Sequence, residues 1–211
     1  MPRQRGFDSG RWPVRRGRRS VLDGPRTAIS DRPFVVLLVG LRINKWWRLD
    51  HIWQALRAFR LLHRDLERDP TSGLLASERW WGNPLLSIQY WESWERLETW
   101  ARRGDGLHRR FWIDYAQRLR AAGSIGVWHE TYLVRPGSYE TVYNAMPAFG
   151  LGCAVSSLIP ARGRAGRAAG RIALGKQDLT RSSAKPMLGW AGQRAEEGRT
   201  QSECQGPDRR G

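Results

Sequence analysis

The chain has 211 residues, enough for one domain of ordinary size with tails, and a formal net charge of +16. Residues 1–33 and 153–211 each carry a net charge of +6, whereas residues 34–152 carry +4 and ten of the twelve tryptophans. This distribution indicates a globular core with basic ends. It disfavours nucleic acid as a partner, because the aromatic residues do not interleave with the basic runs.

The two ends of the chain lack the patterns of folded structure. Residues 1–33 are rich in Arg, Gly and Pro without hydrophobic periodicity, and they predict a disordered basic tail. Residues 175–211 are polar and patternless and predict a second one. The two cysteines, Cys153 and Cys204, lie in unlike contexts and indicate no disulfide framework, which is typical of a cytoplasmic protein.

The first regular element expected is a strand over Phe34–Ile43. Its sequence, FVVLLVGLRI, is a continuous apolar run with β-branched residues, which indicates burial on both faces. The run is far too short to span a bilayer, so we expect no membrane partner. Basic residues precede it, but it lies late in the chain and no small-residue cleavage site follows, which disfavours a signal peptide.

A long helix is expected next. Asp50 can cap it, and Asp69-Pro70 and Gly73 end it. We expect His51 and His63 to lie at the surface or rim. Apolar residues recur at helical spacing along it: Ile52, Leu56, Phe59, Leu62 and Leu66.

A hairpin and two further helices follow. Leu75–Trp81 and Leu85–Trp91 flank Gly82-Asn83-Pro84, the composition of a hairpin turn. Ser93 is placed to cap a short helix. The last helix is expected over His108–Ala121, because large side chains form one helical stripe there: His108, Phe111, Trp112, Tyr115 and Leu119.

The stretch from Gly126 to Gly152 combines an alternating strand with a run rich in Tyr and Gly. Alternation places His129 on the same face as Val127 and Leu133. We therefore expect His129 to point towards a largely apolar interior, where an imidazole needs a partner.

The element order is β-α-β-β-α-β, which predicts a ferredoxin-like α+β fold with helices on one face of an antiparallel sheet. The domain is expected over residues 34–174. Trp80, Trp91 and Trp128 would leave the other face of the sheet strongly apolar. A second copy of the chain is the expected cover, so we predict a homodimer.

His108 and His129 are the strongest candidates for chemistry. The helix rises about 20 Å from His108, and the strand returns roughly 16 Å to His129, so the two imidazoles are expected at similar height. A flat cofactor fits between two such layers. On spacing alone, two buried histidines with internal hydrogen bonds are the favoured alternative.

The expected substrate pocket adds four residues around the histidines. Arg42 and Asn44 follow the first strand and would supply polar groups at the rim, although ordinary strand-end residues are an equal alternative. Trp112 and Tyr115 lie on the helical stripe. No Cys/His cluster has zinc spacing, and no glycine-rich loop matches a phosphate cradle.

Several motifs together resemble a bacterial family of the dimeric α+β-barrel superfamily. The family is known mainly as a domain of unknown function and is often labelled monooxygenase. The resemblance covers about residues 34–174. The motifs are GLRINKWW (40–47), SIQYWESWERLETWAR (87–102), H-x-x-F-W (108–112), GVWHETYLV (126–134) and GSYETVYNAMPAFGLG (137–152).

The same superfamily includes antibiotic-biosynthesis monooxygenases, haem-degrading monooxygenases, chlorite dismutases and haem-containing aldoxime dehydratases, and the last group looks most similar. The resemblance implies that His108 is a proximal haem ligand and that His129 is a distal catalytic group. Aldoxime dehydratases carry two fused repeats, and this chain lacks the additional sequence that supplies further distal polar groups. A homodimer could supply the second repeat.

We therefore expect an enzyme acting on a small organic substrate in a pocket between helix and sheet. It would be a monooxygenase-like oxidoreductase or a haem-dependent lyase, with haem or with no cofactor. The alternative is a non-catalytic ligand-binding or stress-associated dimeric module.

Overall fold

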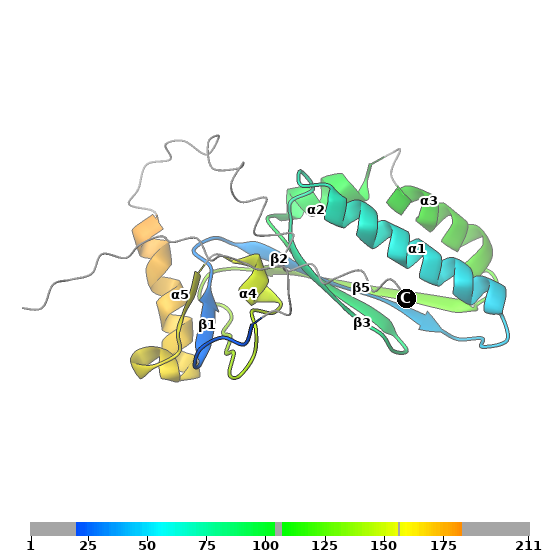
Figure 1. Cartoon of the computed structure of the whole chain (residues 1–211). Helices are drawn as coiled ribbons and strands as arrows, with labels where there is room; N and C mark the ends of the chain where they lie inside the picture. Colours follow the sequence, from blue (N-terminus) through cyan, green and yellow to red (C-terminus); the bar gives the residue numbers. More distant parts are fainter. Residues whose placement is uncertain (1–19, 104–106, 156, 183–211) are drawn as a thin grey trace, which may run out of the picture.

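The computed structural model describes residues 20–103, 107–155 and 157–182 and contains a four-stranded antiparallel sheet with helices on one face (Figure 1). The strands lie in the order β3-β4-β2-β5. They are β2 (Phe34–Ile43), β3 (Leu74–Trp80), β4 (Leu85–Trp91) and β5 (Ile125–Val134). The helices are α1 (Leu49–Arg68), α2 (Trp94–Ala101), α3 (Leu107–Asp114) and the π-helix η1 (Tyr115–Arg120), which continues α3. The predicted ferredoxin-like α+β fold is confirmed.

Strand β2 is central because its apolar run can be buried on both faces. It pairs with β4 on one side and with β5 on the other. In this register Val39 lies opposite both Ser87 and His129. Paired residues share a face, so these three side chains form one row, and the row faces the helices.

Helix α1 buries one stripe against the sheet, as its spacing predicts. Two details of the prediction are wrong. Asp50 does not cap the helix: the N-cap is Arg48, and Asp50 lies in the first turn, where its carboxylate accepts hydrogen bonds from the Arg48 guanidinium. His51 and His63 do not lie at the surface, because both occupy the buried stripe.

The hairpin and the short helix form as predicted. The Asn83–Pro84 peptide bond in the hairpin turn is cis. The Asn83 side-chain amide accepts a hydrogen bond from the Ile43 N–H at 2.9 Å and donates one to the Ile43 carbonyl at 3.2 Å. These two bonds hold the hairpin tip against the end of β2. Ser93 caps α2 by accepting a hydrogen bond from the Arg96 N–H at 3.3 Å.

Two apolar clusters fill the space between helices and sheet. Trp91 belongs to the first and is completely buried, so the expectation that it lies on the open face of the sheet is wrong. Burial of a side chain of this size contributes about 3 kcal/mol. The first cluster contains Val35, Leu66, Leu74, Trp91, Leu97 and Trp100; the second contains Leu41, Ala55, Phe59, Leu85, Leu119 and Ile125.

A smaller unit covers part of the other face of the sheet. Strand β1 (Arg26–Ile29) pairs with β6 (Ser157–Pro160), and the 3-10 helix η2 (Gly163–Gly166) follows. Helices α4 (Leu151–Ala154) and α5 (Ala168–Ser182) complete the unit. A third cluster joins this unit to the sheet through four buried residues: Ala28, Phe34, Tyr143 and Leu151.

This unit corrects the predicted domain boundaries. The predicted tail over residues 1–33 is wrong for residues 20–33, which contain β1. The predicted boundary after residue 174 is also wrong, because α5 continues to Ser182. The remaining parts of both predicted tails, 1–19 and 183–211, lie outside the described residues, as does Cys204. The expectation that the cysteines form no disulfide is wrong for Cys153, which is disulfide-bonded.

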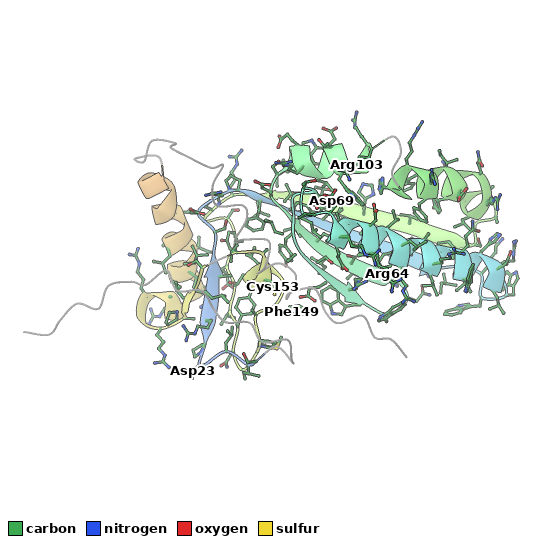
Figure 2. All side chains as sticks on the ribbon, turned by 45° about the horizontal axis from the view of Figure 1, so that its top comes forward. Asp23, Arg64, Asp69, Arg103, Phe149 and Cys153 are labelled. Atoms are coloured by element: carbon green, nitrogen blue, oxygen red, sulfur yellow. The ribbon has the colours of Figure 1, made fainter. Side chains whose placement is uncertain are left out.

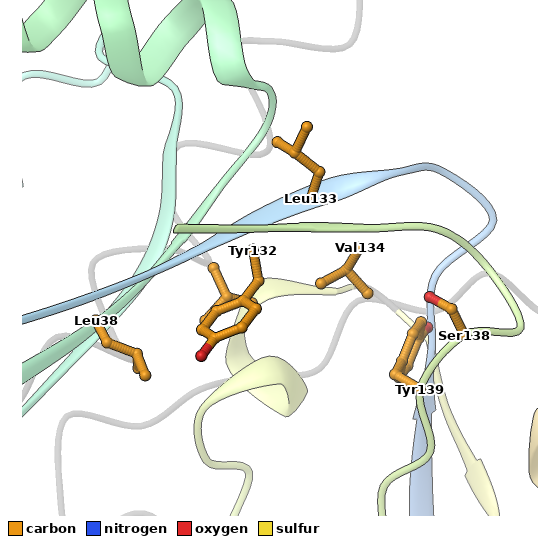
Figure 3. A pocket seen from close by; sticks show the side chains of 7 residues that line it. Leu38, Tyr132, Leu133, Val134, Ser138 and Tyr139 are labelled. Carbon is orange, nitrogen blue, oxygen red and sulfur yellow. The ribbon is translucent and has the colours of Figure 1, made fainter. Parts of the chain in front are cut away.

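The rest of this face is open and largely apolar. Trp128 and Tyr132 on β5 are 40% and 49% exposed, and both donate hydrogen bonds to the Glu130 carboxylate between them. A groove of about 530 Å³ lies beside them, and Figure 3 shows Tyr132 and Leu133 leaving opposite sides of β5 there. The groove is lined by Val36, Leu38, Tyr132, Leu133, Val134, Ser138 and Tyr139. Among the described residues, no helix is both long and apolar enough to cross a bilayer.

Candidate functional site

His108 lies near the start of α3 and is half-buried between aromatic rings. Its Nδ1–H donates to the Ala101 carbonyl at 2.9 Å, so Nε2 carries the lone pair. That lone pair accepts a hydrogen bond from the indole Nε1–H of Trp112 at 3.0 Å. The Trp100 ring lies 5.0 Å from the imidazole, centroid to centroid. Both nitrogens of His108 are therefore engaged.

The position of His108 depends on the end of α2, which supplies the Ala101 carbonyl. Arg103, just beyond that helix, donates to the Asp69 carboxylate at 2.7 Å (Figure 2). Hydrogen bonds from Thr71 and the positive charge of Arg103 hold the pKa of Asp69 below its ordinary value. This ion pair joins the end of α1 to the end of α2 and thereby fixes the acceptor for His108.

The environment of His108 favours the neutral imidazole. Burial lowers its pKa below the ordinary value, the bond to the Ala101 carbonyl raises it, and the positive charge of His129 lowers it. The two histidines are thus close enough for the charge on one to affect the proton affinity of the other.

His129 lies on β5, in the row with Val39 and Ser87 that faces the helices. It is exposed, so the expectation of an apolar interior around it is wrong. The reason is the position of β5 at the edge of the sheet, beyond which the described part of the chain places no further strand. An exposed imidazole on an edge strand can exchange protons with a bound molecule, which a buried one cannot.

The four predicted pocket residues divide into two pairs. Trp112 contacts His108 directly, and the Tyr115 ring meets the Trp112 ring edge to face at 5.5 Å. Arg42 and Asn44 lie elsewhere: Arg42 pairs with Gly126 and points to the open face, three residues from the row of His129. The structure therefore brings the aromatic pair to the histidines and leaves the polar pair at the end of the sheet.

A third histidine, overlooked in the sequence, lies deeper between the same layers. His63 is 3% exposed; its Nδ1–H donates to the Phe59 carbonyl at 2.8 Å, and its Nε2 accepts from the Ser87 hydroxyl at 2.7 Å. Burial lowers the pKa of His63 to about 4. The Gln89 side chain extends this row of buried polar groups, because its amide oxygen accepts a hydrogen bond from the Trp91 indole N–H at 3.1 Å. The spacing in the sequence could have indicated the burial of His63, because it lies one helical turn after Phe59 on the apolar stripe.

The donor set permits a test of the expected haem. The bond from His108 Nδ1 to a carbonyl is the support that a ligating histidine requires. However, the Trp112 indole already binds Nε2 of His108, the nitrogen that would ligate iron. In this arrangement the residues do not fit haem, because the indole would have to be displaced first. Within the described part of the chain, no cluster of three or more His, Cys, Asp or Glu could hold a metal ion.

Comparisons with known proteins agree with this architecture. A curated relative, Monooxygenase af470 of Aspergillus fumigatus, is 29% identical over 100 residues, which cover 44% of this chain and 35% of the relative. An aldoxime dehydratase in complex with butyraldoxime matches with a TM-score of 0.55, 14% identity and coverage of 79% of this chain and 47% of that one. A second aldoxime dehydratase structure matches with a TM-score of 0.53, 16% identity and coverage of 79% and 48%.

The chain spans about half the length of these solved structures, and the match covers about a third of the curated relative. At these identities the solved structures show the fold alone. The family model described as "Monooxygenase af470-like" matches residues 34–151, which is more than half of the chain and includes the sheet, the helices and both candidate histidines. The chain therefore belongs to the Monooxygenase af470-like family.

Proposed function

We propose that this chain is a monooxygenase-like enzyme that acts on a small organic substrate at the site between α3 and β5. The observation that carries the proposal is the juxtaposition of an exposed His129 with a neutral, aromatic-flanked His108 on one side of the sheet. Family membership supports the reaction type.

In this proposal His129 accepts or donates the proton. Its side chain is exposed on an edge strand, so a bound substrate can approach the imidazole. The rings of Trp112 and Tyr115 offer an apolar wall for a flat substrate. His108 keeps Trp112 in place through the indole hydrogen bond and is neutral, so it adds no positive charge beside the substrate.

A haem-dependent, dehydratase-like reaction is the second candidate. It is favoured by the carbonyl support of His108 and by the likeness to aldoxime dehydratases, one of them bound to butyraldoxime. If Trp112 swung away, Nε2 of His108 would be the residue available to hold iron. Bound haem would supply an electrophilic iron centre for the substrate.

Haem titration of the wild type and three variants separates the two candidates. For the cofactor-free reaction we expect equal, weak and non-saturable haem binding by wild type, His108→Ala and His129→Ala. Saturable binding that is lost in His108→Ala and strengthened in Trp112→Phe would favour the haem-dependent reaction instead.

Turnover of a panel of small hydroxyaromatic compounds and aldoximes tests the role of His129. We expect His129→Ala to lower the rate by about 10²–10⁴-fold while the melting temperature is unchanged. A variant with the wild-type rate would overturn the proposal. Saturable binding of these compounds by the wild type with no conversion would favour the non-catalytic alternative.

We further propose a homodimer through the open face of the sheet. Trp128, Tyr132 and the neighbouring groove leave an apolar area that a second copy would cover. Sedimentation at micromolar concentration should give a dimer, and Trp128→Glu should weaken it. A wild-type monomer under these conditions would contradict this proposal.

A further inference from the structure

A second group of exposed aromatic residues lies outside the groove on the open face of the sheet. Trp46 and Trp47 precede α1, Trp53 lies on its second turn, and Trp81 lies at the tip of the β3–β4 hairpin. Together with Leu49 they form the tryptophan end of the domain. Their exposed fractions are 62% for Trp46, 73% for Trp47, 71% for Leu49, 63% for Trp53 and 80% for Trp81.

Hydrogen bonds hold the β2–α1 connection, the β3–β4 hairpin and the segment before β5 together at one end of the sheet. The Asn83 amide holds the hairpin tip against Ile43, which directly precedes the segment that carries Trp46 and Trp47. The Lys45 ammonium donates to the Ala122 carbonyl at 2.7 Å and joins the same segment to the start of β5. Figure 1 shows the β2–α1 connection and the β3–β4 hairpin at the same end of the molecule.

These large side chains are not needed for the core. The inner side of α1 is already occupied by Ala55, Phe59 and Leu66. Tryptophan is usually well buried, so four indoles with more than half of their surface exposed in one region indicate a binding surface.

Positive charges predominate around the tryptophan end. Within four residues of its members along the chain lie five basic residues, Arg42, Lys45, Arg48, Arg57 and Arg79, and two acidic ones, Asp50 and Glu78. Asp50 is already paired with Arg48 at 2.9 Å. The Arg57 guanidinium lies 5.2 Å from the Trp53 ring, so this cation accompanies an exposed indole.

We propose that the tryptophan end docks the protein on an anionic lipid bilayer, with its indoles at the level of the lipid headgroups. Indole prefers the membrane–water interface because it has an apolar body and a polar N–H. Nearby Lys and Arg side chains add attraction to anionic headgroups. The expectation of no membrane partner rested on the absence of a segment long enough to span the bilayer. The proposed contact is different, because the tryptophan end would bind at the bilayer surface without crossing it.

The shape of the region favours a bilayer over a second copy of the chain. The exposed indoles come from chain connections and the first turns of one helix, whereas the groove described above lies on the open face of the sheet. Connections that carry single large side chains can insert into a deformable interface without a complementary groove.

Co-sedimentation of the full chain with lipid vesicles tests the proposal. The probes are phosphatidylcholine vesicles with and without about one third phosphatidylglycerol, at low and high salt. We expect binding to the anionic vesicles, and a loss of about tenfold or more in affinity in the double variant Trp46→Ser, Trp47→Ser. The basic ends of the chain are identical in all variants, so their contribution cancels in the comparison.

Trp94→Ser is the matched control, because Trp94 is 43% exposed on α2, near the opposite end of α1 (Figure 1). We expect this variant to bind like the wild type. Unchanged binding by the double variant, or no vesicle binding by the wild type, would overturn the proposal. A double variant that is monomeric where the wild type is dimeric would also overturn it, since the surface would then join two copies. Equal melting temperatures of all variants establish that folding is unaffected.

Discussion

His63 and His108 make the same pair of hydrogen bonds in two different parts of the helix–sheet interface. Each donates from Nδ1 to a main-chain carbonyl and accepts at Nε2, from Ser87 in one case and from Trp112 in the other. His63 is enclosed between α1 and β4, whereas His108 is half-buried close to the edge strand that carries His129.

Hydrogen bonding therefore does not by itself distinguish a structural histidine from a functional one. Access to solvent, and a neighbouring exposed imidazole, make the difference. His63 has neither a free nitrogen nor a path for a substrate, so its effect should be on stability. The region of His108 and His129 should affect stability less and reactivity more, and four variants or conditions test this gradient.

The largest loss of stability is expected for His63→Ala. The substitution leaves a cavity and strands the Ser87 hydroxyl, so the free energy of unfolding should fall by about 3 kcal/mol. Urea denaturation measures this loss. Ser87→Ala is the matched control and should cost only about 1 kcal/mol, because the imidazole remains in place. A smaller loss in His63→Ala than in Ser87→Ala would contradict this prediction, because it would show that neighbouring side chains fill the space left by the imidazole.

Acid should destabilise the wild type through the same residue. An unfolded histidine binds its proton near pH 6.5, whereas His63 in the folded protein binds one only near pH 4. Between these values the unfolded state holds more protons, so stability is complete above about pH 6.5 and falls by up to about 3 kcal/mol towards pH 4. Unfolding measured across this range should show the fall in wild type and a smaller one in His63→Ala.

A smaller effect is expected for Trp112→Phe. The loss of one half-buried hydrogen bond should cost about 1 kcal/mol. The indole N–H binds only an unprotonated Nε2, so its removal should also raise the pKa of His108 towards the ordinary value. NMR titration of the imidazole measures the shift. Tyr115→Phe, which leaves the indole bond intact, should show none.

The smallest effect on stability is expected for His129→Ala. The side chain is exposed, so the free energy of unfolding should change by no more than about 0.5 kcal/mol. Thermal unfolding beside the turnover assay described above separates the two roles. A loss comparable with that of His63→Ala would show that His129 is a structural residue and would remove the contrast between the two regions.

Local periodicity was sufficient to predict the main sheet and its helices. The apolar run of β2, the turn at Asn83-Pro84 and the stripe of α3 each carry their signal within about ten residues. The same alternation could have placed Trp91 correctly, because it lies two residues from Gln89 and four from Ser87, on the row that faces the helices.

Long-range features were not readable from the sequence. The exposure of His129 depends on the place of β5 at the sheet edge, which local alternation does not encode. The four-residue β1 becomes a strand only by pairing with β6. The hydrogen bond between Trp112 and His108 follows from side-chain rotamers, although their spacing of four residues made a contact foreseeable.

The pairing of β1 with β6 has a consequence for the order in which the molecule assembles. Arg26 lies opposite Pro160, so this short ladder joins segments about 130 residues apart and carries a large loop-closure entropy. The β3–β4 hairpin closes over a few residues and can form early. The ladder should therefore form last and open first. Its opening exposes Phe34 and Tyr90 on the face of the sheet away from the helices while the sheet itself stays intact. The result is a partly unfolded state with an aggregation-prone apolar surface.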